Sequence, residues 1–133
     1  MAKKVLIVED NELNLRLFSD LLRAHEATVD PVRDARDALA RMAAFKPDLV
    51  IMDIQLPHIS GVDLIRRMKL DRALGSIPIM AVTAYAGKGD EANVRDAGAD
   101  AYVSKPISVH KFIAAVEGLI GPLGEPPARR LTA

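Results

Sequence analysis

Short apolar runs alternate with longer amphipathic segments along this chain, and the alternation occurs five times. The runs are too short for buried helices and are bounded by polar residues, so they predict β-strands. Most of them are apolar at consecutive positions, which is typical of strands covered on both faces. The predicted strands are Lys4–Val8, Thr28–Val32, Asp48–Asp53, Ile77–Thr83 and Ala101–Ser104.

Each predicted strand is followed by apolar residues at helical spacing. The first helix is expected to have its apolar residues on one side, and the last has the clearest i, i+3, i+4, i+7 pattern. In chain order they are Leu13, Leu17, Phe18, Leu21 and Leu22; Ala35, Ala38, Leu39 and Met42; Leu64, Ile65 and Met68; Ala92, Val94 and Ala97; and Val109, Phe112, Ile113, Val116, Leu119 and Ile120. The fourth helix, expected over residues 90–97, has no large apolar side chain, so we expect it to be weakly anchored.

Strands separated by helices predict an α/β protein, with a doubly wound parallel sheet covered on both sides. Pro31 cannot donate to a β-ladder, so the second strand should lie at an edge, as it does in the order 2-1-3-4-5. Ser60 and Ser108 are expected N-caps, and Gly98 is expected to end the fourth helix. We expect one (βα)5 domain over residues 1–120, followed by a flexible Pro- and Gly-rich tail over residues 121–133.

Composition excludes several classes of function. Lys plus Arg and Asp plus Glu both number 18, which argues against a nucleic-acid binder. The absence of cysteine excludes disulfides, zinc thiolate sites and thiol catalysis. The apolar run after the amino-terminal lysines is too short for a signal peptide, and the uncharged stretch over residues 77–87 is too short for a membrane span. We therefore expect a soluble cytoplasmic protein that binds neither nucleic acid nor membrane.

Polar residues follow four of the predicted strands at their carboxyl ends, where open α/β sheets bind ligands. Glu9 and Asp10 follow the first strand, Asp53 ends the third, Thr83 ends the fourth and Lys105 follows the fifth. Each residue alone has an ordinary structural explanation; Asp10, for example, could be a helix N-cap. Together they predict an acidic site with one ammonium and one hydroxyl group.

Three neighbouring carboxylates repel one another unless a cation lies among them. Oxygen ligands without His or Cys favour Mg²⁺ over zinc. We expect Asp10 and Asp53 to bind the metal, with Glu9 binding directly or through water and the Gln55 carbonyl completing the set. Asp53 is then the candidate nucleophile, and Thr83 and Lys105 would contact the phosphoryl oxygens.

Four segments make this sequence resemble the receiver domains of two-component response regulators: VLIVEDNELN, DLVIMDIQLPHISG, AVTAYA and AYVSKPIS. The resemblance covers about residues 3 to 120, and the chain is most similar to the single-domain regulators of cell division. It implies a flavodoxin-like (CheY-like) fold, phosphorylation of Asp53, and binding of Mg²⁺ by Glu9, Asp10, Asp53 and Gln55.

The resemblance also implies a conformational switch. Thr83 would swing towards the phosphoryl group, Lys105 would bind it, and Tyr102 would follow into the space that Thr83 leaves. It further implies a cis peptide bond before Pro106 and a turn glycine at Gly61. Glu26 stands where many family members have Gly, which leaves the end of the first helix in question.

We expect the phosphoryl donor to be a phosphohistidine on a sensor histidine kinase or phosphotransfer protein. With no output domain after residue 120, the output would be protein–protein contact, in control of the cell cycle. The partner surface would be formed by the fourth helix, the fifth strand and the last helix, with Lys88, Glu91, Arg95, His110 and Lys111. The protein would be no enzyme beyond its own phosphorylation and dephosphorylation.

Three alternatives have recognisable requirements. A phosphatase of the aspartyl-phosphate type typically has a second Asp two residues after its nucleophile, where this chain has Gln55. A flavodoxin-like mononucleotide-binding module would have a Gly-, Ser- or Thr-rich loop after the first strand, where this chain has Glu9, Asp10 and Asn11. A receiver that works without phosphorylation is disfavoured because no site residue is missing.

Overall fold

The structure is a computed structural model, and it describes residues 2–83, 90–105 and 107–124. Within them, five parallel strands form one sheet in the order β2-β1-β3-β4-β5. The strands are β1 (Lys4–Val8), β2 (Thr28–Val32), β3 (Leu49–Asp53), β4 (Ile79–Thr83) and β5 (Ala101–Ser104). The predicted (βα)5 doubly wound fold and its strand order are therefore confirmed, with Pro31 on an edge strand.

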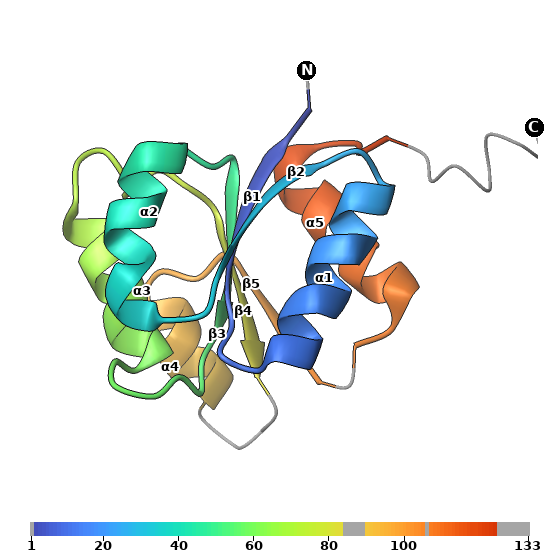
Figure 1. The fold of residues 1–133 in the computed structure, drawn as a ribbon. Helices are drawn as coiled ribbons and strands as arrows, with labels where there is room; N and C mark the ends of the chain where they lie inside the picture. Colours follow the sequence, from blue (N-terminus) through green and yellow to red (C-terminus); the bar gives the residue numbers. More distant parts are fainter. Residues whose placement is uncertain (1, 84–89, 106, 125–133) are drawn as a thin grey trace, which may run out of the picture.

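Helices cover both faces of the sheet, with α1 and α5 on one side and α2, α3 and α4 on the other (Figure 1). Their bounds are α1 (Glu12–Ala24), α2 (Ala38–Phe45), α3 (Gly61–Leu70), α4 (Asp90–Ala97) and α5 (Val109–Ile120), and a 3₁₀ turn (Ala35–Asp37) precedes α2. Successive residues of β3 point to opposite faces, so Val50 packs under α2 to α4 and Ile51 packs towards α1 and α5. The strand is buried at every position, as its continuous apolar run predicts.

The predicted helix boundaries have the expected local chemistry. Ser60 Oγ accepts a hydrogen bond from the backbone N–H of Asp63, and Ser108 Oγ accepts one from that of Lys111, both at 3.2 Å. Gly98 follows α4 with φ +130°, a conformation that suits glycine. Glu26 has φ 69° after α1, so a left-handed turn forms there without the glycine that many family members have.

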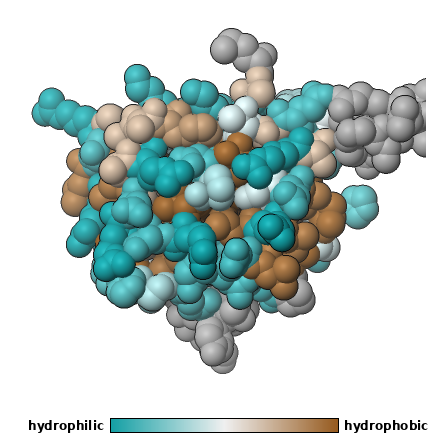
Figure 2. Space-filling view, in the orientation of Figure 1, coloured by the Kyte–Doolittle hydropathy of each residue, from teal (hydrophilic) through white to brown (hydrophobic). Residues whose placement is uncertain are grey.

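The exposed face of α1 corrects one sequence interpretation. Leu13 and Leu17 were expected to lie with the buried leucines, but they are 75% and 54% exposed. Phe18 and Leu22 of the expected stripe are buried, but Leu15 is buried with them in place of Leu13 and Leu17. Phe18 stacks on Phe112 of α5 with ring centroids 5.1 Å apart, which sets the rotation of the helix. Figure 2 shows hydrophobic surface on the side of the molecule where α1 and α5 lie.

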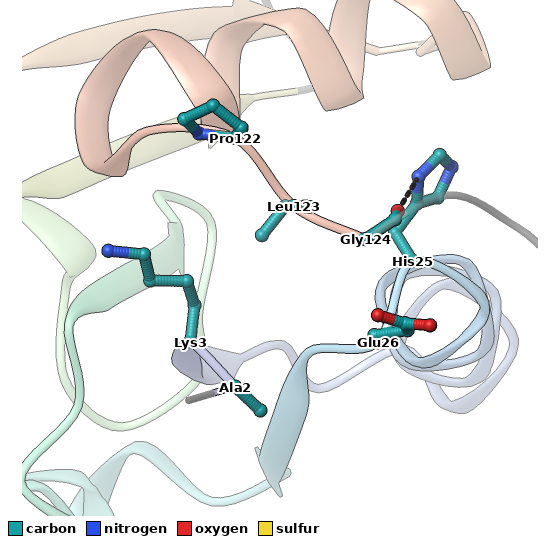
Figure 3. Close-up of a pocket in the computed structure, with 7 residues that line it drawn as sticks. All are labelled: Ala2, Lys3, His25, Glu26, Pro122, Leu123 and Gly124. Carbon is teal, nitrogen blue, oxygen red and sulfur yellow. Dashed lines mark hydrogen bonds between the residues drawn. The ribbon is translucent and has the colours of Figure 1, made fainter.

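Residues 121–124 continue beyond α5 and lie against the end of α1 (Figure 3). The backbone N–H of Gly124 donates to the His25 carbonyl at 2.8 Å, and His25 Nδ1 lies 3.1 Å from the Gly124 carbonyl. Together with Lys3 and Glu26 they line a cavity of about 290 Å³ at the amino end of the sheet. The rest of the predicted tail, residues 125–133, lies outside the described residues. No helix in the described ranges is both long and apolar enough to cross a membrane.

Candidate functional site

The polar residues predicted at the carboxyl ends of the strands do meet in space, at the lower end of the sheet in Figure 1. Carboxylate oxygens of Glu9, Asp10 and Asp53 all lie within 4.8 Å of one another. Lys105 reaches in from the end of β5, and its Nζ lies 2.8 Å from Glu9 Oε1 and 3.4 Å from Asp53 Oδ2. Asp10 is not the N-cap of α1, because Asn11 accepts the capping hydrogen bond instead.

Glu9 is the most deeply enclosed of the three carboxylates, with 1% of its surface exposed. Its Oε2 has no hydrogen-bond partner among the described residues. Burial raises the pKa of Glu9 to about 7; the Asp53 side chain adds to this shift and Lys105 opposes it. Burial also disfavours a charged Lys105, but its contacts with Glu9 and Asp53 outweigh burial and raise its pKa.

This charge balance fits a bound divalent cation. In the described part of the site, one ammonium group faces three carboxylates, and one buried carboxylate oxygen still needs a donor or a cation. The three clustered side chains all offer carboxylate oxygens, the ligand type that Mg²⁺ prefers. Glu9, Asp10 and Asp53 could therefore hold Mg²⁺.

Asp53 is held in place by the loop that follows β3. It is 4% exposed, and its Oδ1 accepts a hydrogen bond of 3.0 Å from the backbone N–H of Gln55. Gly61 allows this loop to close against the first turn of α3. A Cβ at Gly61 would lie 2.6 Å from the Asp53 carbonyl oxygen and 2.7 Å from Ile54 Cα, so any side chain there would displace the loop.

Thr83 and Tyr102 lie on the α4 side of the site. Thr83 is 2% exposed, and its hydroxyl oxygen accepts a hydrogen bond of 2.9 Å from Gln55 Nε2. Thr83 and half-buried Tyr102 line a cavity of about 170 Å³ together with Val94 of α4. The predicted cis peptide bond before Pro106 lies outside the described residues.

Sequence reasoning gave no role to three features of this site. The Gln55 side chain contacts Thr83, whereas the sequence pattern assigns a role only to the Gln55 carbonyl. Arg33 and His58 line an open cavity of about 320 Å³ beside Asp10. An amide two residues after Asp53 was a usable signal, whereas Arg33 and His58 are brought to the site by loops whose paths the sequence pattern does not predict.

Comparison with known proteins agrees with this geometry. The family model described as response regulator receiver domain matches residues 5–117. The polar-differentiation response regulators DivK of Brucella anthropi and Brucella ovis are each 47% identical to the chain over 121 residues, which is 91% of this chain and 98% of theirs. The expected similarity to a single-domain regulator of cell division is thereby confirmed.

Solved structures extend the comparison to the fold. A CheY-like receiver domain protein of Methanospirillum hungatei is 26% identical, with a TM-score of 0.82, and covers 89% of this chain and 93% of its own. The receiver domain of a sensor histidine kinase from Pseudomonas aeruginosa is 29% identical, with a TM-score of 0.83 and coverage of 91% and 99%. That second structure has a magnesium ion coordinated in its active site cleft. From the sheet order, the acidic site and the extent of these matches, the chain belongs to the response regulator receiver domain family.

Proposed function

We propose that this receiver domain accepts a phosphoryl group on Asp53 from a phosphohistidine donor and thereby changes the surface that binds partner proteins. The observation that carries the proposal is the cluster of Glu9, Asp10 and Asp53 with Lys105 bridging two of its members. The donor would be a sensor histidine kinase or a phosphotransfer protein. The protein would catalyse only its own phosphorylation and dephosphorylation.

In the transfer step, a carboxylate oxygen of Asp53 forms a bond to phosphorus as the donor's nitrogen–phosphorus bond breaks. The electron pair of that bond goes to the donor's imidazole nitrogen, which later takes up a proton. The Gln55 backbone N–H holds Oδ1 of Asp53 in place. Lys105 Nζ lies 3.4 Å from Oδ2 and can stabilise the negative charge of the phosphoryl oxygens once the group is transferred.

Glu9, Asp10 and Asp53 would hold Mg²⁺ with the Gln55 carbonyl. When bound, the ion neutralises charge on the phosphoryl oxygens and on the carboxylates. Glu9 Oε2, which has no partner among the residues that the structure describes, supports this assignment, because a buried carboxylate oxygen without a donor is costly.

The signal would leave the site through Thr83 and Tyr102. A phosphoryl group on Asp53 would draw the Thr83 hydroxyl towards it, and Tyr102 would move into the adjoining cavity. We propose that partners bind the face formed by α4, β5 and α5, where Arg95, His110 and Lys111 are exposed. Glu91 belongs to this face as well and pairs with Arg95 at 2.8 Å, whereas Lys88 lies outside the described residues.

The donor would dock on a second surface. Leu13 and Leu17 lie one helical turn apart on α1, just after Asp10, and are large, exposed and apolar. Exposed apolar groups close to a reactive centre suit a partner helix that carries the reacting histidine. The names of the DivK relatives, polar-differentiation response regulators, support a role in cell-cycle or cell-polarity control.

Phosphorylation can be tested directly with Mg²⁺ and acetyl phosphate, followed by intact-mass measurement. We expect the mass to increase by one phosphoryl group in the parent protein and in Asp63→Asn, an exposed carboxylate on α3 that serves as the matched control. Asp53→Asn should not be labelled. Unchanged labelling of Asp53→Asn would refute the proposed acceptor.

We do not expect this protein to hydrolyse small phosphate esters. Gln55 occupies the position where an aspartyl-phosphate phosphatase would have its second aspartate. The Gln55 side chain also hydrogen-bonds to Thr83, and an amide in that contact is no general acid.

A further inference from the structure

Gln55 contacts both the proposed phosphoacceptor and the proposed switch residue. Its backbone N–H donates to Asp53 Oδ1 at 3.0 Å, and its side-chain Nε2 donates to Thr83 Oγ1 at 2.9 Å. The first contact belongs to the main chain and would survive a change of side chain. The second depends on the amide group itself, so the two contacts can be separated by mutation.

Thr83 has little freedom except rotation of its side chain. It is the last residue of β4, it is 2% exposed, and its carbonyl accepts a hydrogen bond of 2.7 Å from the Lys105 backbone N–H. A response to a phosphoryl group on Asp53 therefore requires the hydroxyl to turn while the backbone stays in the sheet. Thr83 and Tyr102 both line the cavity of about 170 Å³, so Tyr102 has room to follow such a change.

The Gln55 contact restrains that rotation through the position of the hydroxyl oxygen. A threonine hydroxyl can accept one hydrogen bond and donate another, so the contact limits where the oxygen lies and not whether it can donate. While Gln55 Nε2 donates to it, the oxygen is held towards the loop after β3. Turning the oxygen towards a phosphoryl group on Asp53 stretches or breaks this bond.

We propose that the side-chain amide of Gln55 is a latch: its hydrogen bond holds Thr83 in its resting rotamer. The strength of this bond then sets how much free energy phosphorylation must supply to move Thr83 to its switched rotamer. The inference rests on the proposed function of Asp53 and Thr83. Gln55 is a positioning residue in this scheme, since it acts on the phosphoryl group only through Thr83.

The size of the effect follows from the strength of one hydrogen bond. A net contribution typical of a neutral hydrogen bond corresponds to about a 2- to 10-fold change in the ratio of resting to switched protein. A ligand that binds the switched state has an apparent affinity reduced by the population of that state. Removing the latch should therefore tighten binding of a phosphoryl mimic by about 2- to 10-fold.

Gln55→Met is the appropriate variant because it keeps the length of the side chain and the backbone N–H to Asp53 but removes the amide donor. Beryllofluoride would be titrated in the presence of Mg²⁺ into the parent protein, Gln55→Met, Thr83→Val and the double variant. We expect Gln55→Met to bind beryllofluoride more tightly in the parent background and to have no effect in the Thr83→Val background. An equal effect in both backgrounds would mean that Gln55 acts in some other way, and the latch would be rejected.

A second measurement needs no phosphoryl mimic. Three-bond couplings at Thr83 report its χ1 rotamer in the protein without Mg²⁺ and beryllofluoride. We expect one rotamer in the parent protein and a mixture in Gln55→Met; a single unchanged rotamer in both would overturn the latch. If beryllofluoride fails to bind even the parent protein, the proposed function of Asp53 fails, and the couplings still decide whether Gln55 holds Thr83. If beryllofluoride binds the parent and Gln55→Met equally, the latch fails and the proposed function stands.

Discussion

Carboxylates lie at both ends of the sheet, but their surroundings differ. At the amino end, Asp48 Oδ2 accepts the backbone N–H of Lys4 at 2.8 Å, and Asp100 Oδ2 accepts that of Ile79 at 2.9 Å. At the carboxyl end, Glu9, Asp10 and Asp53 crowd within 4.8 Å of one another.

The direction of parallel strands explains the difference. A carboxylate that precedes a strand, as Asp48 and Asp100 do, meets the free N–H groups at the start of the neighbouring strand. A carboxylate at the carboxyl end of a strand lies beside carbonyl oxygens of the neighbouring strands, and of the three there only Asp53 accepts a hydrogen bond from a backbone N–H within the described residues, that of Gln55. At the amino end a backbone N–H therefore satisfies each carboxylate, with Lys69 Nζ a further 3.9 Å from Asp100 Oδ2, whereas the crowded carboxylates at the carboxyl end call for a cation.

The largest test of this comparison is the Mg²⁺ affinity of Asp10→Asn. Two unit charges about 4 Å apart attract by about 4 kcal/mol at an effective dielectric constant near 20, and a divalent ion attracts a carboxylate more strongly still, so we expect affinity to fall by at least about 100-fold. Isothermal titration calorimetry measures it. Asp48→Asn, the matched change at the amino end, should leave Mg²⁺ affinity unaltered; an equal loss in both variants would show that the two ends do not differ in this way.

The next effect is the pH dependence of stability without metal. Because the folded-state pKa of Glu9 is raised from 4.5 to about 7, its contribution to stability is complete below about pH 4.5 and is lost as the pH rises through 7. We expect the free energy of unfolding in EDTA to fall by on the order of 2–3 kcal/mol from this group between about pH 5 and 8. Chemical denaturation across that range would measure it.

Two comparisons check the source of this pH dependence. Glu9→Gln has no titrating group and should flatten the profile, and saturating Mg²⁺ should restore stability at high pH because the cation favours the ionised carboxylates. A profile that keeps its slope in Glu9→Gln would assign the effect to another group.

The smallest effect concerns the amino end. Asp100→Ala leaves the Ile79 N–H without its acceptor, so we expect a loss of about 1–2 kcal/mol in the free energy of unfolding. Asp100→Asn keeps an acceptor oxygen and should lose less. Mg²⁺ affinity should stay within about 2-fold of the parent in both variants. The charge that each variant removes lies at the far end of the sheet from the ion and is screened by salt.

Much of the site could be predicted because it depends on where strands end. A buried run that finishes in Asp53 places this carboxylate at the carboxyl end of the sheet whatever the loops do. The contact between Gln55 and Thr83 could not be predicted, because these residues are far apart in sequence and the path of the loop after β3 decides whether their side chains meet.

By itself, the sequence determined the five strands, their parallel arrangement, the edge position of the strand with Pro31 and the residues that meet at the carboxyl end. These features depend on local periodicity and on chain direction, which a sequence carries in full. Tertiary structure alone decided which stripe of α1 is buried. The helix has two overlapping leucine stripes, and stacking of Phe18 on Phe112 turns Leu15 inward and leaves Leu13 in solvent. The helical repeat gives the same spacing to both stripes of apolar residues. Only packing against a neighbouring element decides which of the two stripes is buried.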